Sequence, residues 1–330
     1  MRGVIDTRNK GWAGIVAALC VPLLLAAGGA VAQKYPDRPI RLIVPYAPGG
    51  SSDAIGRILG QTMGQALGQT LVIDNRAGAA SIIGRSLAAK ATPDGYTLMI
   101  GDAVHSINVH VLRAVPYHPI RDFTFISLVG HSPMVLAVHP HVAPDLKGFI
   151  AQARAQPGRL NYGMGGTGSI THLTGELFKK SAGVDVAAVP YKSIGLAVTA
   201  LIGAQVQAAF PSLPPTVAHA KAGRLRVLAV AADQRASVLP EVPTFTEAGV
   251  RNVVVSNWFG LMGPAGLSPA IVSRLHAETV KALQAPDVRA KFAAMALEIV
   301  ANRPAEFKAM VEAETARWGV VVKQAGIQPE

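Results

Sequence analysis

A glycine-rich turn between a strand-like run and a helix-like run could bind an anion. Ile40–Val44 is an apolar run, interrupted by Arg41, that is typical of a buried strand, and helical spacing starts at Ser51 or Ser52, either of which can cap the helix. The first N–H groups of a helix lack intrahelical acceptors and lie at the positive end of its dipole, which favours a carboxylate or phosphate. Gly49 and Gly50 let a ligand approach the backbone closely. A tight connection without a ligand explains the same residues equally well.

A second glycine-rich segment, from Gly163 to His172, stands in the same relation to its neighbours. It follows a strand-like run and opens a helix-like pattern. Gly163, Gly165 and Gly168 match the G-x-G-x-x-G pattern of dinucleotide-binding folds. That fingerprint also needs an acid at the end of the next strand, whereas Asp185 comes before it. The pattern therefore supports a dinucleotide site only weakly, and we expect no cofactor.

Hydroxyl side chains in this second segment add hydrogen-bond donors to those of the backbone. They belong to Thr167, Ser169 and Thr171. Amides and hydroxyls in such a turn suit a carboxylate. Two segments of this kind, facing each other, would clamp a small dicarboxylate or a similar anion. A few charge-assisted hydrogen bonds of about 1.5–3 kcal/mol each suffice for micromolar binding after the entropic cost of association.

Catalytic and metal-binding arrangements have less support. Ser169 and His172 could form a hydrolytic triad with Asp102, but Ser169 lacks the G-x-S-x-G elbow. Both Ser169 and His172 also fit the opening of a helix. The other histidines show no H-E-x-x-H or similar spacing, so we expect no metal. The sequence predicts a protein that is not an enzyme.

The elements that would position these segments alternate between strand and helix, which predicts an α/β fold. Strand-like apolar runs lie at 40–44, 70–74, 96–100, 123–129, 134–138, 186–189, 206–210, 225–231 and 258–262, and Asn161-Tyr162 is expected to end a strand. Helical spacing starts near 51, 82, 170, 194, 214, 268, 286 and 304. The segment Gly101–Ser106 is expected to be a polar loop at a strand end, where open α/β sheets bind ligands, which makes His105 a candidate contact.

The first 32 residues have the pattern of a secretory signal peptide. Basic residues precede an apolar stretch from Gly11 to Ala27, and Ala30 and Ala32 supply small residues for cleavage. The stretch is short for a membrane span and Pro22 interrupts it. We therefore expect an exported protein that is cleaved after Ala32.

Composition restricts the kind of partner. Cys20 is the single cysteine and lies inside the expected signal, so the exported chain would contain no disulfide. The formal net charge is +11, but the basic residues are scattered, and 9 Phe, 6 Tyr and 3 Trp are few for stacking on bases. We expect an anionic solute as the partner, and no nucleic acid.

Several segments of the chain match one family. They are Tyr35 to Pro45, Pro48 to Gly50, Pro93 to Leu98, Gly165 to Leu173, Val189 to Lys192, Leu239 to Thr244, Glu247 to Gly249, and Trp258 with Gly260-Leu261. On these segments the chain resembles the Bug family of periplasmic solute-binding proteins, the receptors of tripartite tricarboxylate transporters. The resemblance implies a type 2 periplasmic binding protein, with two α/β lobes, crossing strands and a ligand cleft. With the prolines that follow 138 as a boundary, lobe 1 is expected at 33–137 and 233–330, and lobe 2 at 138–232.

The resemblance also implies which residues hold the ligand. The backbone around Gly49 and the loop that ends at His172 would hold a carboxylate, Asp53 can line the pocket, and Tyr191 enters from the second lobe. The expected ligand contacts are Tyr46, Pro48, Gly49, Gly50, Ser52, Asp53, His105, Gly165, Gly166, Thr167, Ser169, His172 and Tyr191.

Three positions depart from the family pattern. Ser193 replaces a glycine, Ala200 stands where the family commonly has an Asp, and Gln207 replaces another frequent acid. Without the carboxylate at 200, an acceptor for a ligand ammonium is missing, which favours an organic acid over an amino acid. A bulkier or aromatic carboxylate, or a ligand role that has drifted, explains Ala200 as well.

The function implied by the resemblance is capture of a small carboxylate, organic, aromatic or dicarboxylic, by a periplasmic monomer. The receptor would deliver it to the membrane permease subunits of a tripartite transporter. A ligand-sensing partner of a signalling receptor fits the same sequence, and an exported serine hydrolase using Ser169 fits it less well.

Overall fold

The computed structural model describes Gly3, residues 35–324 and residues 326–329. The chain divides into two units, Met1–Asp37 and Arg38–Glu330, and the described helices and strands belong to the second unit. The expected signal peptide, with its cleavage site and Cys20, lies outside the described residues apart from Gly3.

The larger of two sheets in the second unit has six strands, in the order β11-β4-β10-β3-β1-β2. Its parallel part consists of β1 (Ile40–Val44), β2 (Leu71–Asn75) and β3 (Thr97–Asp102). The other strands are β4 (Phe123–Pro133), β10 (Ser256–Pro264) and β11 (Glu298–Ile299). Because β1 runs parallel to β3, the carboxyl ends of these two strands share one edge, and β10 runs antiparallel to both β3 and β4.

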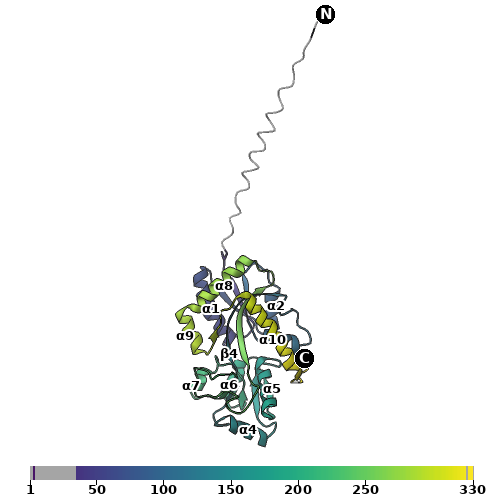
Figure 1. Ribbon diagram of the computed structural model, residues 1–330, viewed down its shortest axis with the longest axis vertical. Helices are drawn as coiled ribbons and strands as arrows, with labels where there is room; N and C mark the ends of the chain where they lie inside the picture. Colours follow the sequence, from purple (N-terminus) through teal and green to yellow (C-terminus); the bar gives the residue numbers. More distant parts are fainter. Residues whose placement is uncertain (1–2, 4–34, 325, 330) are drawn as a thin grey trace. The chain divides into compact units, whose positions relative to one another are not determined.

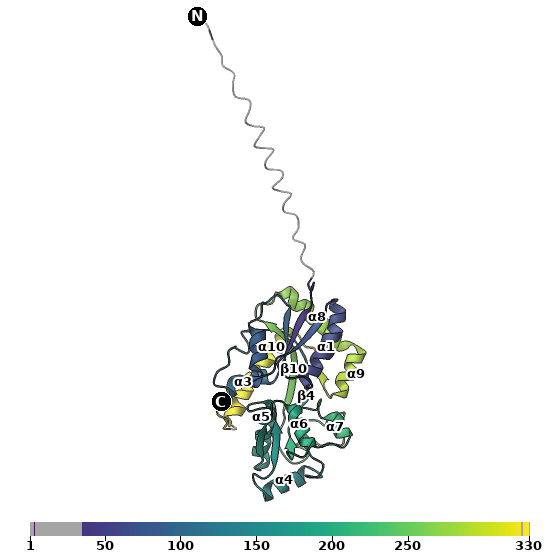
Figure 2. The same ribbon diagram turned by 180° about the vertical axis from the view of Figure 1, so that it is seen from behind.

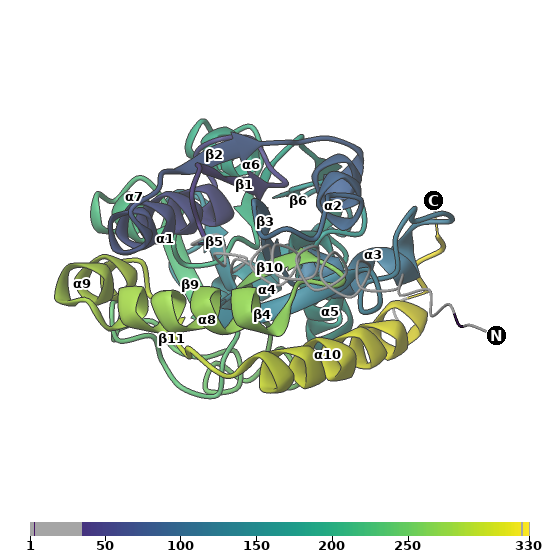
Figure 3. The ribbon, with the colours of Figure 1, turned by 90° about the horizontal axis from the view of Figure 1, so that it is seen from above.

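Helices flank this sheet in two groups. The helices α1 (Ser51–Leu67), α8 (Pro269–Gln284) and α9 (Pro286–Ala294) pack together, while α10 (Pro304–Gln324) packs on α3 (Val104–Val111) (Figure 3). A 3-10 turn (Ala79–Ser81) leads into α2 (Ile82–Ala89). Both α8 and α9 have a proline in the first turn. The first N–H groups of a helix have no intrahelical acceptor, so the N–H that proline lacks costs no hydrogen bond there.

The smaller sheet has five strands in the order β7-β6-β8-β5-β9. They are β5 (Val135–Val138), β6 (Asn161–Met164), β7 (Ala187–Pro190), β8 (Ala208–Ala209) and β9 (Arg226–Val230). Its helices are α4 (Leu146–Ala155), α5 (Ile170–Ala182), α6 (Ile194–Ile202) and α7 (Val217–Lys221). Figures 1 and 2 show α4 to α7 gathered around this sheet, apart from α1, α8 and α9.

The chain crosses from one sheet to the other twice. It leaves the larger sheet after Pro133, the end of β4, and returns at Ser256, the start of β10. The crossing segments lie side by side, since the Met134 amide donates to the Val255 carbonyl at 2.9 Å. This arrangement confirms the two-lobed α/β fold with crossing strands.

The changes of sheet also locate the two lobes. The strand β5, expected to end lobe 1, pairs with β8 and β9. Residues after β9 stay on the smaller sheet, because Val230 bridges to Thr244. We therefore place the larger lobe at 38–133 and 256–329, and the smaller lobe at 134–255. The sequence-based expectation put the two boundaries between 137 and 138 and between 232 and 233.

Aromatic side chains fill the interior of each lobe. Phe149, Phe178 and Phe210 are buried in the smaller lobe, and Phe307 and Trp318 of α10 are fully buried in the larger one. Burial of each such side chain contributes about 1.5–3 kcal/mol to the stability of the fold, relative to leaving it exposed to water.

Most expected elements are confirmed within a few residues, and β1 matches its expected ends. Three local predictions are wrong. The N-cap of α1 is Gly50, in an extended conformation, and not one of the serines that follow it. The expected loop at 101–106 is the end of β3 and the start of α3, because Val104, Ile107 and Val111 form an apolar helix face that the polar residues between them obscure. Asn161 starts β6 and does not end a strand.

Within the described residues, no helix combines the length and apolar character needed to cross a membrane.

Candidate functional site

The N-terminus of α1 presents open amides at the carboxyl end of β1. Gly50 caps the helix without a side-chain hydrogen bond, and the first intrahelical bond runs from the Ala54 amide to the Gly50 carbonyl at 3.0 Å. The amides of Ser51, Ser52 and Asp53 therefore have no acceptor within the helix. These three residues are buried, so an anion at this point would be shielded from solvent.

Asp53 holds the glycine turn in place. Its carboxylate accepts from the Gly49 amide, the Arg57 Nε and the Asn75 Nδ2, each at 3.0 Å. Burial opposes its ionisation, but these hydrogen bonds outweigh burial and hold the pKa of Asp53 below its ordinary value. Asn75 also donates to the Tyr46 carbonyl at 3.1 Å. The expected pocket-lining role of Asp53 stays a prediction. Its role in shaping the turn follows from these hydrogen bonds.

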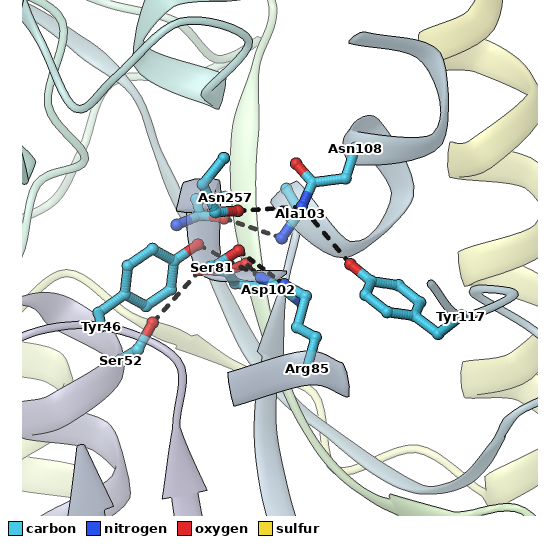
Figure 4. Close-up of polar contacts among 10 residues, drawn as sticks. Tyr46, Ser52, Ser81, Arg85, Asp102, Ala103, Asn108, Tyr117 and Asn257 are labelled. Carbon is cyan, nitrogen blue, oxygen red and sulfur yellow. Dashed lines mark hydrogen bonds and ion pairs between the residues drawn. The ribbon is translucent and has the colours of Figure 1, made fainter. Parts of the chain in front are cut away.

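A buried ion pair between Arg85 and Asp102 lies beside this turn (Figure 4). Asp102 ends β3, and Arg85 comes from α2. The Ser52 hydroxyl donates to the second carboxylate oxygen of Asp102 at 3.4 Å. Tyr46 also hydrogen-bonds with Asp102, and Arg85 Nη2 donates to the Tyr46 hydroxyl at 3.3 Å. Asp102 thus joins the turn after β1, α1 and α2 at one edge of the sheet.

Arg85 is fully buried, which is costly for a cation unless it is paired. Its Nε donates to Ser81 Oγ at 2.8 Å, while Nη1 finds no partner in the described part of the chain. Burial opposes its charge, but the Asp102 carboxylate outweighs burial, so the pKa of Arg85 lies above its ordinary value. The guanidinium is therefore permanently charged and held in one place.

Burial raises the pKa of the Tyr46 hydroxyl, and the negative charge of Asp102 raises it further. Tyr46 therefore stays protonated and can donate a hydrogen bond. Next to Asp102, the Ala103 amide donates to Asn257 Oδ1 at 3.2 Å, which ties β3 to β10. Figure 4 also shows Asn108 of α3 reaching Tyr117, at 3.4 Å.

His105 lies inside the larger lobe and is not exposed at its surface. Its ring is fully buried, stacks on Tyr117 and meets Phe123 edge-on, and its Nε2 lies 2.7 Å from the Pro119 carbonyl oxygen. Burial and the charge of Arg85 lower the pKa of His105 to about 3, so the ring is neutral at pH 7. Its assignment as a ligand contact remains a prediction that this packing does not favour.

The glycine loop of the smaller lobe satisfies several of its own amides. Ser169 caps α5 by accepting from the His172 amide at 3.2 Å. Thr171 Oγ1 accepts from the Gly165 amide at 2.8 Å, and His172 Nδ1 accepts from the Gly168 amide at 3.0 Å. Part of the donor set expected to hold a ligand is thus used to fix the loop. The first amides of α5, at Ile170 and Thr171, still lack intrahelical acceptors.

The remaining expected contact and the departures from the family pattern lie in and around α6. Tyr191 is half-buried, and its amide donates to the Met164 carbonyl at 2.9 Å, so it stands beside the glycine loop. Ser193 caps α6. Ala200 is buried in the apolar core of the smaller lobe, and Gln207 bonds to the Asn161 amide at 2.9 Å, at the opposite edge of the sheet from that loop.

Two contacts bring the sheet edges of the lobes together. Ser51 Oγ and Ser212 Oγ lie 3.3 Å apart. Since β8 is parallel to β6, Ser212 follows β8 at the edge where Gly166 follows β6. Elsewhere Gly168 packs so closely on Val111 of α3 that a Cβ at this glycine would lie 2.5 Å from Val111 Cγ2.

The structure thus brings the expected contacts of each lobe to the carboxyl edges of the two sheets, but the ring of His105 is buried in the aromatic core of the larger lobe. Sequence reasoning missed Arg85, Ser212 and Asn257, and it considered Asp102 only as a triad member. Asp102 at a strand end is the one signal that could have pointed to the network.

The residues of the alternative hydrolytic triad have other partners. Ser169 Oγ lies 2.7 Å from Thr171 Oγ1 and caps α5, and Asp102 pairs with Arg85. Among the residues the structure describes, no group of three or more His, Cys, Asp or Glu could hold a metal ion.

An open groove of about 660 Å³ lies elsewhere on the smaller lobe, lined by residues such as Pro140, Asp145 and Arg226. These residues follow β5 or begin β9, at the edge opposite to the glycine loop. None of the described residues expected to contact a ligand lines it.

Two α/β lobes with crossing strands and helix N-termini at adjoining sheet edges define the class of two-lobed solute-binding proteins. The model of the tripartite tricarboxylate transporter family receptor matches residues 55–327, and the chain belongs to this family.

Individual relatives agree with this assignment. The chain is 37% identical over 298 residues to Protein BugT of Bordetella pertussis, covering 89% of this chain and 91% of BugT. A structure of an R. palustris protein with adipate is 34% identical, with a TM-score of 0.87 and coverage of 90% and 100%. MatC from Rhodopseudomonas palustris with bound malate is 30% identical, with a TM-score of 0.83 and coverage of 87% and 100%.

Proposed function

We propose that this receptor binds a small organic carboxylate between its lobes, outside the cytoplasmic membrane, and performs no chemistry on it. The observation that carries the proposal is the set of amides at Ser51, Ser52 and Asp53. These residues are buried, their amides have no acceptor within the helix, and they lie beside the contact with Ser212 of the other lobe. Such amides are donors only, so they select an acceptor group such as a carboxylate.

The relatives support the same ligand class. Family members of similar fold have been solved with adipate and with malate, both small dicarboxylates. One carboxylate would lie at α1 and the other near the first turn of α5. We include Tyr46, Pro48, Gly49, Gly50, Gly165, Gly166, Thr167 and Tyr191 in this proposed site by their position on the two turns.

The same family membership supports the remaining parts of the proposal. The receptor would be a periplasmic monomer, released by cleavage after Ala32, that hands its ligand to membrane permease subunits. Amino-terminal sequencing of the protein from a periplasmic fraction should begin at Gln33. An uncleaved amino terminus would contradict this processing.

A pair of variants tests the amide site. Ser51→Pro removes one donor at the first position of α1, where proline is tolerated, and the extended Gly50 before it is compatible with proline. Ser51→Ala is the matched control, because it removes the hydroxyl and keeps the amide. Isothermal titration with adipate, glutarate, malate and aspartate identifies the ligand class.

We expect the tightest of these acids to bind Ser51→Pro about 10-fold or more weakly than Ser51→Ala, since a hydrogen bond to a charged group is worth about 1.5–3 kcal/mol. Equal affinity of the two variants, or no binding of any carboxylate by the unmodified protein, contradicts the proposal. Ester turnover that is lost in Ser169→Ala would support a hydrolase instead.

A further inference from the structure

A carboxylate stands next to the open amides of α1, which is an unexpected place for a negative charge. Ser52 contributes one of these amides, and its hydroxyl lies 3.4 Å from Asp102 Oδ2. An anion bound at these amides would therefore lie within a few ångströms of Asp102. Alone, this carboxylate would repel such a ligand.

Arg85 cancels that repulsion. Its guanidinium is fully buried and paired with Asp102, and Nη1 has no other partner among the described residues. No other carboxylate is bonded to this guanidinium within the described chain. The second acid at the turn, Asp53, is likewise balanced, by Arg57 at 3.0 Å. The amide site thus lies between two ion pairs of zero net charge.

Resting on the proposed function, we propose that Asp102 is a specificity-determining residue that limits how much negative charge the larger lobe accepts. By balancing Arg85, it leaves the amides of α1 as the attraction for an anion, because the hydroxyls of Ser52 and Tyr46 already bond to Asp102 itself. These amides are enough for one carboxylate. A ligand with a further carboxylate at this lobe meets Asp102 without a free cation to compensate it.

The geometry makes the two single substitutions act in opposite directions. Asp102→Asn keeps a polar group of nearly the same shape beside Arg85 and leaves one buried positive charge next to the amides. Arg85→Gln leaves the opposite charge, on Asp102. A preference set by charge must move one way in the first variant and the other way in the second.

Glutarate and tricarballylate are suitable probes, because they share a five-carbon chain and differ by one carboxylate on its middle carbon. The ratio of their dissociation constants, measured by isothermal titration at low and at physiological salt, reports the charge preference. Asp94→Asn is the matched control, since it removes an equal charge from the exposed pair with Arg38. Asp94 precedes β3, whereas Asp102 ends it, so the control lies at the other edge of the sheet.

We expect unmodified protein to prefer glutarate, and Asp102→Asn to shift the ratio toward tricarballylate by at least tenfold, most strongly at low salt. Arg85→Gln should shift it the opposite way, and Asp94→Asn should leave it unchanged. Thermal unfolding checks that each variant folds, and either single variant suffices for the test. If the ratio of the two dissociation constants stays the same in the variants that fold, this inference is overturned but the proposed function is not. Failure of the unmodified protein to bind any carboxylate overturns the proposed function, and this inference with it.

Discussion

Ser51 of α1 and Ser212 of the smaller lobe are both buried, with their hydroxyl oxygens 3.3 Å apart. Ser51 starts the helix whose amides form the proposed site, and Ser212 follows β8 at the edge that carries the other glycine loop. The contact therefore forms only when the two sheet edges approach each other. It links closure of the lobes to the geometry of the proposed site.

Removing this contact should weaken ligand binding without unfolding either lobe. Ser212→Ala is expected to raise the dissociation constant for the tightest carboxylate by about 2- to 10-fold, as a neutral hydrogen bond contributes about 0.5–1.5 kcal/mol. In a double-mutant cycle measured by isothermal titration, Ser51→Ala should add little once Ser212 is changed. Fully additive losses would show that the two hydroxyls act independently.

Gly168 is expected to be the least tolerant glycine of the smaller-lobe loop. Its φ is +71°, and a Cβ would lie 2.5 Å from Val111 Cγ2, so Gly168→Ala combines backbone strain with a clash between lobes. Gly183→Ala is a matched control, since φ is +62° there and nothing lies within 4 Å of the added atom. We expect the control to cost about 1 kcal/mol of stability and Gly168→Ala about 2–4 kcal/mol.

Urea unfolding of both variants, each with and without Val111→Ala, separates the two contributions. Val111→Ala removes the Cγ2 contact but leaves its own Cβ 2.9 Å from the added atom, so it should reduce the penalty at Gly168 without bringing it down to that at Gly183. A penalty at Gly168 that is unchanged by Val111→Ala would mean that strain, and not contact between the lobes, constrains the loop.

Local patterns in the chain predicted the scaffold well. The apolar run of β1 and the apolar face of α6, which ends at Gly203, need only neighbours in sequence to be recognised. The proposed donor amides could likewise be anticipated, because any strand followed by a glycine turn and a helix exposes them.

Pairings between distant residues could not be predicted in this way. Arg85 and Asp102 are 17 positions apart, and nothing near Arg85 indicates that α2 turns it inward. The same limit applies to Ser212, whose partner is 161 positions away. His105 illustrates the converse: a polar residue near a strand end was expected at the site, but α3 turns it into an aromatic core.

Asp53→Asn should loosen the first glycine turn. The carboxylate accepts three hydrogen bonds, from Gly49, Arg57 and Asn75, and an amide cannot accept all of them. We expect a loss of about 1–3 kcal/mol in the free energy of unfolding, together with weaker carboxylate binding. Because the pKa of Asp53 is lowered by folding, its contribution is complete above the ordinary carboxyl pKa of about 4 and is lost as pH falls through the folded value.

Asp287→Asn is a control of the same type, since Asp287 also pairs with a cation four residues later, Lys291, but on an exposed helix. This substitution should change stability by less than about 0.5 kcal/mol. Similar losses for the two variants in urea unfolding would show that Asp53 is only a surface charge.

The neutral, buried His105 should make the protein more stable at pH 7 than at pH 5. Burial first, and then Arg85, lower its pKa from 6.5 to about 3, so between these values the unfolded chain binds a proton that the folded chain excludes. Stability from this residue is therefore complete above about pH 6.5 and falls as pH decreases toward 3. At pH 5 the loss is about 2 kcal/mol.

His105→Gln keeps a donor for the Pro119 carbonyl and removes the titration. Urea curves give the unfolding free energy of this variant at pH 5 and at pH 7. The difference between these two values should be about 2 kcal/mol smaller than the same difference for the unmodified protein. The comparison uses a difference between two pH values, so a general loss of stability in the variant does not affect it. His141→Asn, at an exposed position, is the control and should keep the full pH dependence. If His105→Gln keeps it as well, proton uptake by other groups must account for the acid sensitivity.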